Sequence, residues 1–343
     1  MENKSMTYIA SEPELDDMST LDQYQQSSII KAIGVGGGGI NAVNQMLIHI
    51  KDINYVVLDS DSQQLNRSPV LNRVLLRQDT THRSATEESE SEIAALFDDD
   101  TKMAIIIAGM GGGTGTCAAP AVARIAREKE VTLTVGIVTI PFKFEGTNKI
   151  LKALDGIEEM RKHVDALFTI NNQCLTEIHN DLDPTNAFAK SYETLTTVAR
   201  SLCDMTTAYY KTCIDFNDLN YTLRKSGNAI IFSGYAKGER RVTKALEDAF
   251  ESPLLKDCDI YCSRKMMMAF LYNPDSESPL RMNEMNEIQE FIENFDKEMD
   301  VIWGLAHDHT LEDQIKVTVL ASGFNVSYKS DIKPLKNMLS QNS

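Results

Sequence analysis

The sequence has too few basic residues to bind nucleic acid over its surface. Its 343 residues include 34 lysines and arginines against 50 aspartates and glutamates, which gives a formal net charge of −16. No block of basic residues offsets this balance, so most of the surface would repel the phosphates of DNA or RNA. A ligand that carries phosphates must therefore be held locally, by backbone N–H groups or through a metal ion.

The sequence also lacks an apolar run long enough to cross a bilayer, and its N-terminal stretch MENKSMTYIASEPELDD contains no signal-peptide core. We therefore expect a cytoplasmic protein without direct membrane insertion. Only six cysteines are present, and Cys258 and Cys262 have no histidine or second cysteine pair nearby that would complete a zinc site. We expect no metal held by side chains alone and interpret the cysteines as reduced packing residues.

From Ile29 onwards, strand-like apolar runs alternate with segments of helical period. The runs MAIIIAG, TLTVGIVTI and ALFTIN are continuous in apolar residues, which is typical of strands that are covered on both faces. The alternation predicts a parallel doubly wound α/β sheet, with ligands beyond the carboxyl ends of its strands. Residues 1–28 are acidic, show no period and are expected to form a mobile arm.

The second half of the chain has a different pattern. A long segment of helical period from Asp183 to Tyr210 predicts a single helix that connects two halves. Beyond it, strands are separated by helices and longer loops, which predicts a smaller α+β domain with a mixed sheet. The expected order is a ligand-binding domain over 29–182, a connecting helix over 183–212, an α+β domain over 213–325 and a polar tail over 326–343.

Two glycine-rich segments lie at the ends of predicted strands. The first, Gly34–Gly39, fits the pattern G-x-G-x-x-G between a strand and a helix. Asp59 ends the next strand, where a dinucleotide fold places a ribose-binding acid. Taken alone, this segment indicates an NAD-binding enzyme about as strongly as it indicates an ordinary strand-to-helix turn.

The second segment, GMGGGTGT from Gly109 to Thr116, changes this balance. A dinucleotide fold needs no second glycine-rich loop here, and no Gly-Lys-Ser/Thr follows as in a P-loop. Two strand–glycine–helix units side by side would aim two helix N-termini at one polyphosphate. Six scattered histidines also give no clear proton donor for a dehydrogenase.

The second segment carries a resemblance to a known family. GGGTGTCAAP is similar to the GGGTGTGAAP motif of FtsZ, the bacterial tubulin relative that polymerises at the division site. IGVGGGGINAVNQM, VTIPFKFEG, AFAKSYETL, IDFNDL and IKVTVLASGF agree with the family in order, from about Ile29 to Phe324. The resemblance implies a tubulin/FtsZ-like fold: a parallel Rossmann-type GTP-binding domain joined by a long central helix to a smaller α+β domain. It also implies head-to-tail assembly into filaments.

The resemblance implies roles for individual residues. The phosphate loops match Gly36, Gly37, Gly38, Asn41, Gly109, Gly111, Gly112, Gly113, Thr114, Gly115 and Thr116. Glu145 matches a ribose-binding acid, and Lys149 stands where an arginine usually follows that motif. Asn172 matches an asparagine that contacts guanine, Phe188 a ring that stacks on guanine, and Glu193 an acid that accepts from guanine N1 and N2. The implied ligand is GTP or GDP, with Mg²⁺ held through phosphates and water.

Asp215 and Asp218 match a loop that, in the family, enters the nucleotide site of the next subunit. There, two acids polarise a water for attack on the γ-phosphate, so hydrolysis would require assembly. The residues themselves also fit a capping box, with Asp215 as the N-cap of a helix and Asp218 three residues on. Both interpretations stay open at this point.

The sequence departs from the family at positions that, in the family, lie near the γ-phosphate or sense it. The span from Leu76 to Thr86 is shorter than the family's glycine-rich loop and contains no glycine. Cys213 and Asp59 each replace an asparagine, and Cys117 replaces a glycine. We therefore expect nucleotide binding to survive and hydrolysis to be slow or impaired.

The resemblance leaves more than one function open. We expect an assembling GTP-binding protein of cell division that acts in the cytoplasm, at the division site, with a conventional FtsZ or other division proteins as candidate partners. One alternative is a non-hydrolysing FtsZ-like paralogue with a regulatory role. A further alternative is an NAD-binding Rossmann enzyme.

Overall fold

The computed structural model describes residues 28–326, apart from 52, 78–88, 98–99, 179–182, 208–209, 213, 257, 294 and 296–297. Most of the predicted N-terminal arm and of the C-terminal tail therefore lies outside the described residues. The same holds for Cys213 and for most of the shortened span that runs to Thr86. No helix within the described ranges is both long and apolar enough to cross a membrane.

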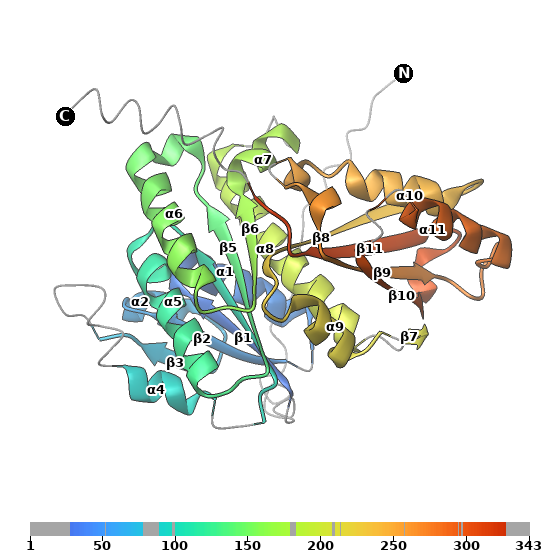
Figure 1. Cartoon of the computed structure of the whole chain (residues 1–343). Coiled ribbons are helices and arrows are strands. Elements are labelled where there is room, and N and C mark those ends of the chain that lie inside the picture. Colours follow the sequence, from blue (N-terminus) through green and yellow to red (C-terminus); the bar gives the residue numbers. More distant parts are fainter. Residues whose placement is uncertain are drawn as a thin grey trace, which may run out of the picture.

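The described strands form one sheet of eleven strands, in the order β3-β2-β1-β4-β5-β6-β8-β11-β9-β10-β7 (Figure 1). Strands β1 to β6 pair in parallel, and their order is that of a doubly wound fold. They are β1 (Ile30–Val35), β2 (Asn54–Asp59), β3 (Asn72–Leu75), β4 (Met103–Gly109), β5 (Leu133–Ile140) and β6 (Ala166–Asn171). The structure thus confirms the predicted parallel sheet.

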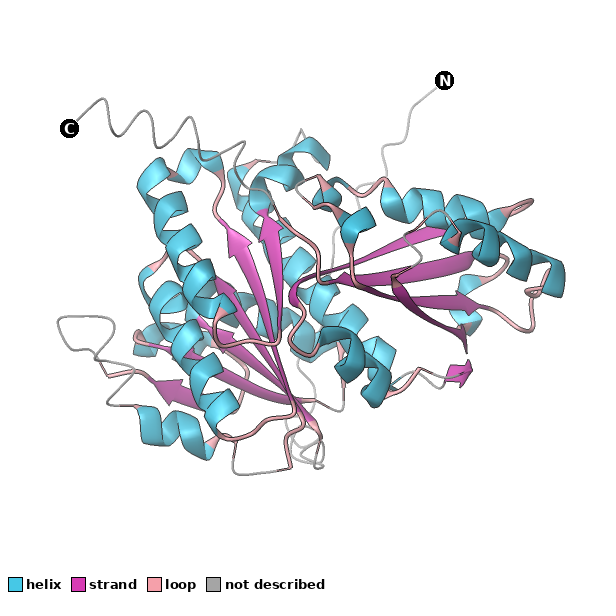
Figure 2. Cartoon of the chain, in the orientation of Figure 1, coloured by secondary structure: helices cyan, strands magenta, loops and turns pink. Residues whose placement is uncertain are grey.

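Helices cover both faces of this parallel part, as Figure 2 shows. They are α1 (Gly36–His49), α2 (Ser62–Arg67), α4 (Glu90–Ala95), α5 (Gly113–Glu128), α6 (Thr147–Arg161), α7 (Asn172–Ile178) and the short η2 (Lys143–Glu145). Along β4, Ile105 and Ile107 pack into the core under α1, whereas Ile106 packs into the core under α5 and α6. This two-sided burial explains why the strands are continuous apolar runs.

The glycine-rich segments contain less loop than expected. The second segment is itself partly helical, since α5 begins at Gly113. Likewise, α1 begins at Gly36, directly after β1. Glycine has no side chain to obstruct the tight strand-to-helix turn, so several glycines form the first turns of the two helices.

A long helix, α8 (Pro184–Thr207), follows α7 and leads to β7 (Tyr210–Thr212) and α9 (Phe216–Leu223). The observed helix ends a few residues before the predicted end at Tyr210, because Tyr210 belongs to a strand that pairs with β10. Together, α1 and α8 pack on one face of the parallel strands.

The remaining strands form a mixed sheet, as predicted. They are β8 (Gly227–Ala236), β9 (Lys265–Tyr272), β10 (Asp300–His307) and β11 (Ile315–Ser322), with α10 (Arg241–Phe250), α11 (Met285–Ile292) and the short η3 (Pro253–Leu255), η4 (Ile260–Cys262), η5 (Met282–Glu284) and η6 (His309–Leu311). β11 runs antiparallel to β8 and β9, while β9 and β10 are parallel. β8 pairs with β6 through Ala166 and Gly227, which makes the two sheets continuous. β9 begins shortly after the 3₁₀ turn η4.

The close approach of α1 to β4 generates a first prediction. A Cβ atom on Gly39 would lie 2.2 Å from the carbonyl oxygen of Ile107, whereas one on Gly37 would meet nothing within 4 Å. We expect Gly39→Ala to lower the free energy of unfolding by about 2 kcal/mol or more, because the backbone must shift to admit the methyl group. Gly37→Ala, the matched control, should change it by less than about 1 kcal/mol. Urea unfolding of nucleotide-free protein measures both, and equal effects would contradict the packing argument.

Candidate functional site

The two glycine turns abut each other because β1 and β4 are neighbours in the sheet. Gly36 has φ +72°, and a Cβ atom there would lie 2.9 Å from the backbone nitrogen of Gly115. Only glycine adopts this backbone readily with so little room. The strand order reverses between β1 and β4, which is where doubly wound sheets bind their ligands.

Both helices that begin here lack a side-chain cap at the N-terminus. Neither Val35 before α1 nor Gly112 before α5 forms a side-chain cap. The first N–H groups of α1 and α5 have no partner inside their helix, and both helix dipoles point their positive ends to the same place. This arrangement suits a polyphosphate.

A cavity of about 250 Å³ opens at the glycine turns. Twelve predicted residues line it: Gly36, Gly37, Gly38, Gly109, Gly112, Gly113, Thr114, Gly115, Glu145, Lys149, Asn172 and Phe188. Five residues that the sequence did not indicate also line it: Met110, Thr139, Pro141, Ser191 and Tyr192. The structure therefore brings residues from eight helices and strands, and from the turns between them, to a single cavity.

Four of the predicted nucleotide-binding residues lie outside this lining. Asn41 is exposed on α1, and Gly111 and Thr116 lie within the second turn. The Thr116 hydroxyl accepts from the Gly111 N–H (2.8 Å) and donates to the Gly112 carbonyl (2.5 Å), so it holds the turn in shape. Glu193 lies on an exposed face of α8, where Lys190 Nζ is 2.8 Å from its carboxylate. The contact of Glu193 with guanine stays a prediction.

Thr114 has acidic surroundings. Its hydroxyl donates to Asp59 Oδ1 (3.3 Å) and lies 3.0 Å from the hydroxyl of Ser60. Asp59 is only 4% exposed and also accepts from the Asp61 N–H (3.1 Å). Because a carboxylate only accepts hydrogen bonds, Asp59 takes the proton that Thr114 would otherwise offer to a phosphate.

Glu145 and Lys149 form an ion pair at the edge of the cavity. Lys149 Nζ is 2.6 Å from Glu145 Oε2, and Glu145 Oε1 accepts from the Phe142 N–H (2.8 Å). The second bond fixes the carboxylate at the start of α6, where a sugar hydroxyl could donate to it. Lys149 supplies one positive charge near the glycine turns, without the planar fork of an arginine.

Phe188 lines the cavity from α8. Its ring packs edge-on against Phe142 (centroids 5.4 Å apart) and Phe144 (5.9 Å), which are stacked on each other at 4.9 Å. Edge-to-face packing of this kind fixes the plane of a ring. Phe188 therefore offers a rigid flat surface, which suits a planar base.

Asp215 and Asp218 form a capping box at the start of α9. Asp215 Oδ1 accepts from the N–H groups of Asn217 (2.7 Å) and Asp218 (3.1 Å), and Asp218 Oδ2 accepts from the Asp215 N–H (3.0 Å). The hydrogen bond from the Asp218 N–H, more than any other contact, lowers the pKa of the Asp215 carboxyl. Neither acid lines the cavity. The capping interpretation is thus observed, and the catalytic role stays a prediction.

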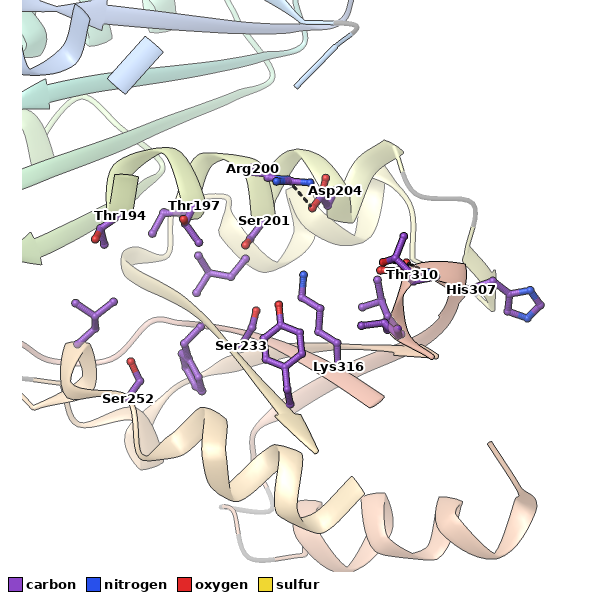
Figure 3. A pocket seen from close by; sticks show the side chains of 18 residues that line it. Thr194, Thr197, Arg200, Ser201, Asp204, Ser233, Ser252, His307, Thr310 and Lys316 are labelled. Atoms are coloured by element: carbon purple, nitrogen blue, oxygen red, sulfur yellow. Dashed lines mark hydrogen bonds and ion pairs between the residues drawn. The ribbon is translucent and has the colours of Figure 1, made fainter. Parts of the chain in front are cut away.

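A second, larger hollow of about 810 Å³ lies between α8 and the C-terminal strands (Figure 3). Arg200 and Asp204 face it from α8, and Lys316 faces it from β11. Arg200 Nε lies 3.8 Å from Asp204 Oδ2. None of the predicted site residues lines this hollow.

Comparisons with known proteins agree with this geometry. The model of the Tubulin/FtsZ family GTPase domain matches residues 29–180, and that of the FtsZ family C-terminal domain matches residues 227–325. Fold and site together thus define a nucleotide-binding protein of the tubulin/FtsZ class.

Comparison with individual relatives identifies the family within this class. A cell division protein FtsZ from Porphyromonas gingivalis is 44% identical over 311 residues, covering 87% of this chain and 67% of that protein. One from Azotobacter vinelandii is 33% identical over 333 residues, covering 93% and 83%. The structure of an empty FtsZ dimer from M. jannaschii superposes with a TM-score of 0.76 at 28% identity, covering 91% of this chain and 93% of that one. The chain belongs to the FtsZ family.

Asp59 generates a prediction for nucleotide affinity. Asp59→Asn should strengthen the binding of a nucleoside diphosphate on the order of tenfold, because it removes a negative charge near the phosphates. Asp61→Asn is the control, since it removes an exposed charge nearby and asparagine still caps α2. Isothermal titration of nucleotide-free protein measures both, and weaker binding by Asp59→Asn would refute this role.

Asp204 generates a prediction for pH dependence. Although 46% of its side chain is exposed, burial of the rest raises the pKa of the Asp204 carboxyl, outweighing the nearby Arg200 and Lys316. The folded state therefore binds this proton more tightly than the unfolded chain does, and wild-type stability gains from protonation as pH falls through the raised pKa. We expect Asp204→Asn to raise Tm slightly at pH 7, with a gain that shrinks toward pH 4. Asp155→Asn, an exposed change on α6, should show no such trend in thermal scans.

Proposed function

We propose that this chain is an FtsZ-like GTP-binding protein of cell division, which assembles head to tail into filaments and hydrolyses GTP slowly between subunits. The observation that carries the proposal is the single cavity in which two glycine turns, the Glu145–Lys149 pair, Asn172 and Phe188 meet. One end suits a polyphosphate, the edge suits a ribose and the far end suits a planar base. Mg²⁺ would reach the site with the phosphates and water, as it usually does in nucleotide sites.

Head-to-tail assembly is supported by the distance between the cavity and the acids. Phe188 lies near the start of α8 and Thr207 at its end, and the roughly 19 residues between them span about 28 Å. Figure 1 places α7 and α9 well apart, on either side of α8. Asp215 and Asp218 could therefore act only on a nucleotide held by another subunit. The GTPγS-bound protofilament of CetZ2 from Haloferax volcanii has this fold, with a TM-score of 0.76 at 16% identity.

Slow hydrolysis is supported by the hydrogen bonds that Asp215 and Asp218 already accept. Each carboxylate already accepts backbone N–H groups of the capping box. Hydrogen bonds to a carboxylate stabilise its charge and weaken it as a base. Two departures from the family also weaken the contacts available to a γ-phosphate. Asp59 adds a negative charge beside the cavity, and Lys149 keeps the positive charge of an arginine but lacks its planar fork.

The same observation supports one alternative, a non-hydrolysing paralogue that regulates another filament. In that case the capping box is the whole function of Asp215 and Asp218. Light scattering with GTP and with GDP separates the two functions. Assembly that requires GTP supports the proposal, and assembly indifferent to the nucleotide supports the alternative.

A pair of substitutions tests the catalytic role directly. Asparagine caps a helix about as well as aspartate, so Asp215→Asn keeps the cap and removes the charge, whereas Asp215→Ala removes both. If the acid acts on the neighbour's nucleotide, both variants should lower phosphate release by about tenfold or more while GDP affinity stays unchanged. If Asp215 is only a cap, the asparagine variant keeps wild-type turnover, and that result would sink the catalytic role.

A further inference from the structure

We propose that Thr116 and Gly156 together position the second glycine turn (Gly109–Thr116), so that helix α6 controls how well this turn binds phosphate. The inference deepens the proposed nucleotide-binding function and rests on it. Thr116 is a positioning residue, which acts through the backbone of the turn and does not touch the ligand. Gly156 lies outside the cavity, on the buried side of α6, and leaves the space that Thr116 needs.

The turn contains a run of three glycines, Gly111, Gly112 and Gly113, with little conformational preference of its own. Gly111 has φ +95°, a backbone conformation that other residues rarely adopt. Without a constraint, the peptide units of such a run can rotate and present a carbonyl oxygen to the cavity in place of an N–H group. A carbonyl oxygen repels a phosphate, so binding requires that these peptide units be held in one orientation.

The hydroxyl of Thr116 supplies this constraint through two hydrogen bonds. It accepts from the Gly111 N–H (2.8 Å) and donates to the Gly112 carbonyl (2.5 Å). Both directions are fixed, because an N–H group only donates and a carbonyl oxygen only accepts. The one proton of the hydroxyl is therefore used within the turn, and Thr116 accordingly lies outside the lining of the cavity.

The bond to Gly112 also fixes the N–H group that follows it. A peptide unit is planar and trans, so its C=O and N–H point in opposite directions. Because the Gly112 carbonyl points to Thr116, in the first turn of α5, the Gly113 N–H of the same peptide unit points away from the helix. Gly112 and Gly113 both line the cavity, so this N–H is offered to a ligand there.

Helix α6 packs directly against Thr116 at Gly156. A Cβ atom on Gly156 would lie 2.5 Å from Cγ2 of Thr116, which is too close for either atom to stay in place. Seven residues earlier on α6, the Lys149 carbonyl oxygen lies against Gly111, where a Cβ atom would approach it to 2.7 Å. Seven residues are about two turns of helix, so both contacts lie on the same face of α6. This face therefore supports the turn at two points.

The contact with Thr116 explains why residue 156 is a glycine. Glycine is unfavourable inside a helix relative to alanine, so its presence in α6 requires a reason in the packing. A methyl group on Gly156 would push the Thr116 methyl group away. Since the methyl and hydroxyl groups of threonine share one carbon atom, the hydroxyl would move as well, and its bonds to Gly111 and Gly112 would weaken.

Two substitutions of Thr116 separate the role of its hydroxyl from that of its methyl group. Thr116→Val keeps the shape and removes both hydrogen bonds, whereas Thr116→Ser keeps the hydroxyl and removes the methyl group. We expect Thr116→Val to weaken GDP binding by about tenfold or more, and Thr116→Ser to stay within about threefold of the wild type. Isothermal titration of nucleotide-free protein measures both affinities, and equal affinities of the two variants would overturn the proposal.

A second substitution in the same chain tests the contact with α6. Gly156→Ala should weaken GDP binding by about tenfold, and adding Thr116→Ser should bring the affinity back to within about threefold of the wild type, because it removes the clashing atom. The matched control is Gly156→Ala with Thr114→Ser, which removes a methyl group from the same turn without relieving the clash. Recovery in both double variants, or in neither, would refute the contact.

Amide hydrogen exchange of the nucleotide-free protein, followed by NMR, distinguishes positioning from direct contact with phosphate. If Thr116 holds the turn, Thr116→Val should speed the exchange of the Gly111 N–H before any ligand is added. Weaker GDP binding with unchanged exchange at Gly111 would mean that Thr116 touches the ligand, which contradicts the proposal. Thermal unfolding of the same samples checks the fold. A Gly156→Ala variant with a lowered Tm and wild-type affinity for GDP has only a packing role, and this result also counts against the proposal.

The outcomes keep this inference apart from the proposed function. If the wild-type protein does not bind GDP, the guanine-nucleotide function fails and the role of Thr116 in it fails as well. If the wild type binds GDP and both Thr116→Val and Gly156→Ala bind it equally well, the function stands and only the inference falls.

Discussion

The close approach of the turns after β1 and β4 is the constraint on which the rest of the structure depends. These two strands lie side by side where the strand order reverses, so the helices that follow them leave on opposite faces of the sheet. Only glycine allows the two turns to touch, as at Gly36 and Gly115. This contact brings the N-termini of two helices, with their N–H groups, to one cavity. An acidic protein can then bind a polyphosphate without a basic surface.

The long helix α8 connects this cavity to the rest of the molecule. The first turns of α8 supply Phe188, Ser191 and Tyr192 to the lining of the cavity. Further along the helix, Arg200 and Asp204 line the larger hollow. The helix ends at Thr207, and the chain then leads toward α9. A rigid helix of this length separates the phosphate turns from the capping box of Asp215. This separation supports the proposed hydrolysis between subunits, since neither Asp215 nor Asp218 lines the cavity of its own chain.

Much of the fold follows from local patterns in the sequence. The continuous apolar runs predict strands that are buried on both faces. The glycines after β1 and β4 predict tight turns. Both features can be recognised from neighbouring residues alone. The capping box was also predictable, because Asp215 and Asp218 are three residues apart. The place of Ser191 in the cavity was not predictable, since it depends on the packing of α8, which involves residues far apart in the sequence. The contact of Glu193 with the base, which the matching motifs imply, stays a prediction.

The central claim is that the paired glycine turns hold a guanine nucleotide. The most direct measurement is the identity of the nucleotide that copurifies with the full chain, obtained by denaturing the protein and separating the released ligand chromatographically. The account predicts GTP or GDP in the released fraction. Recovery of NAD would contradict it.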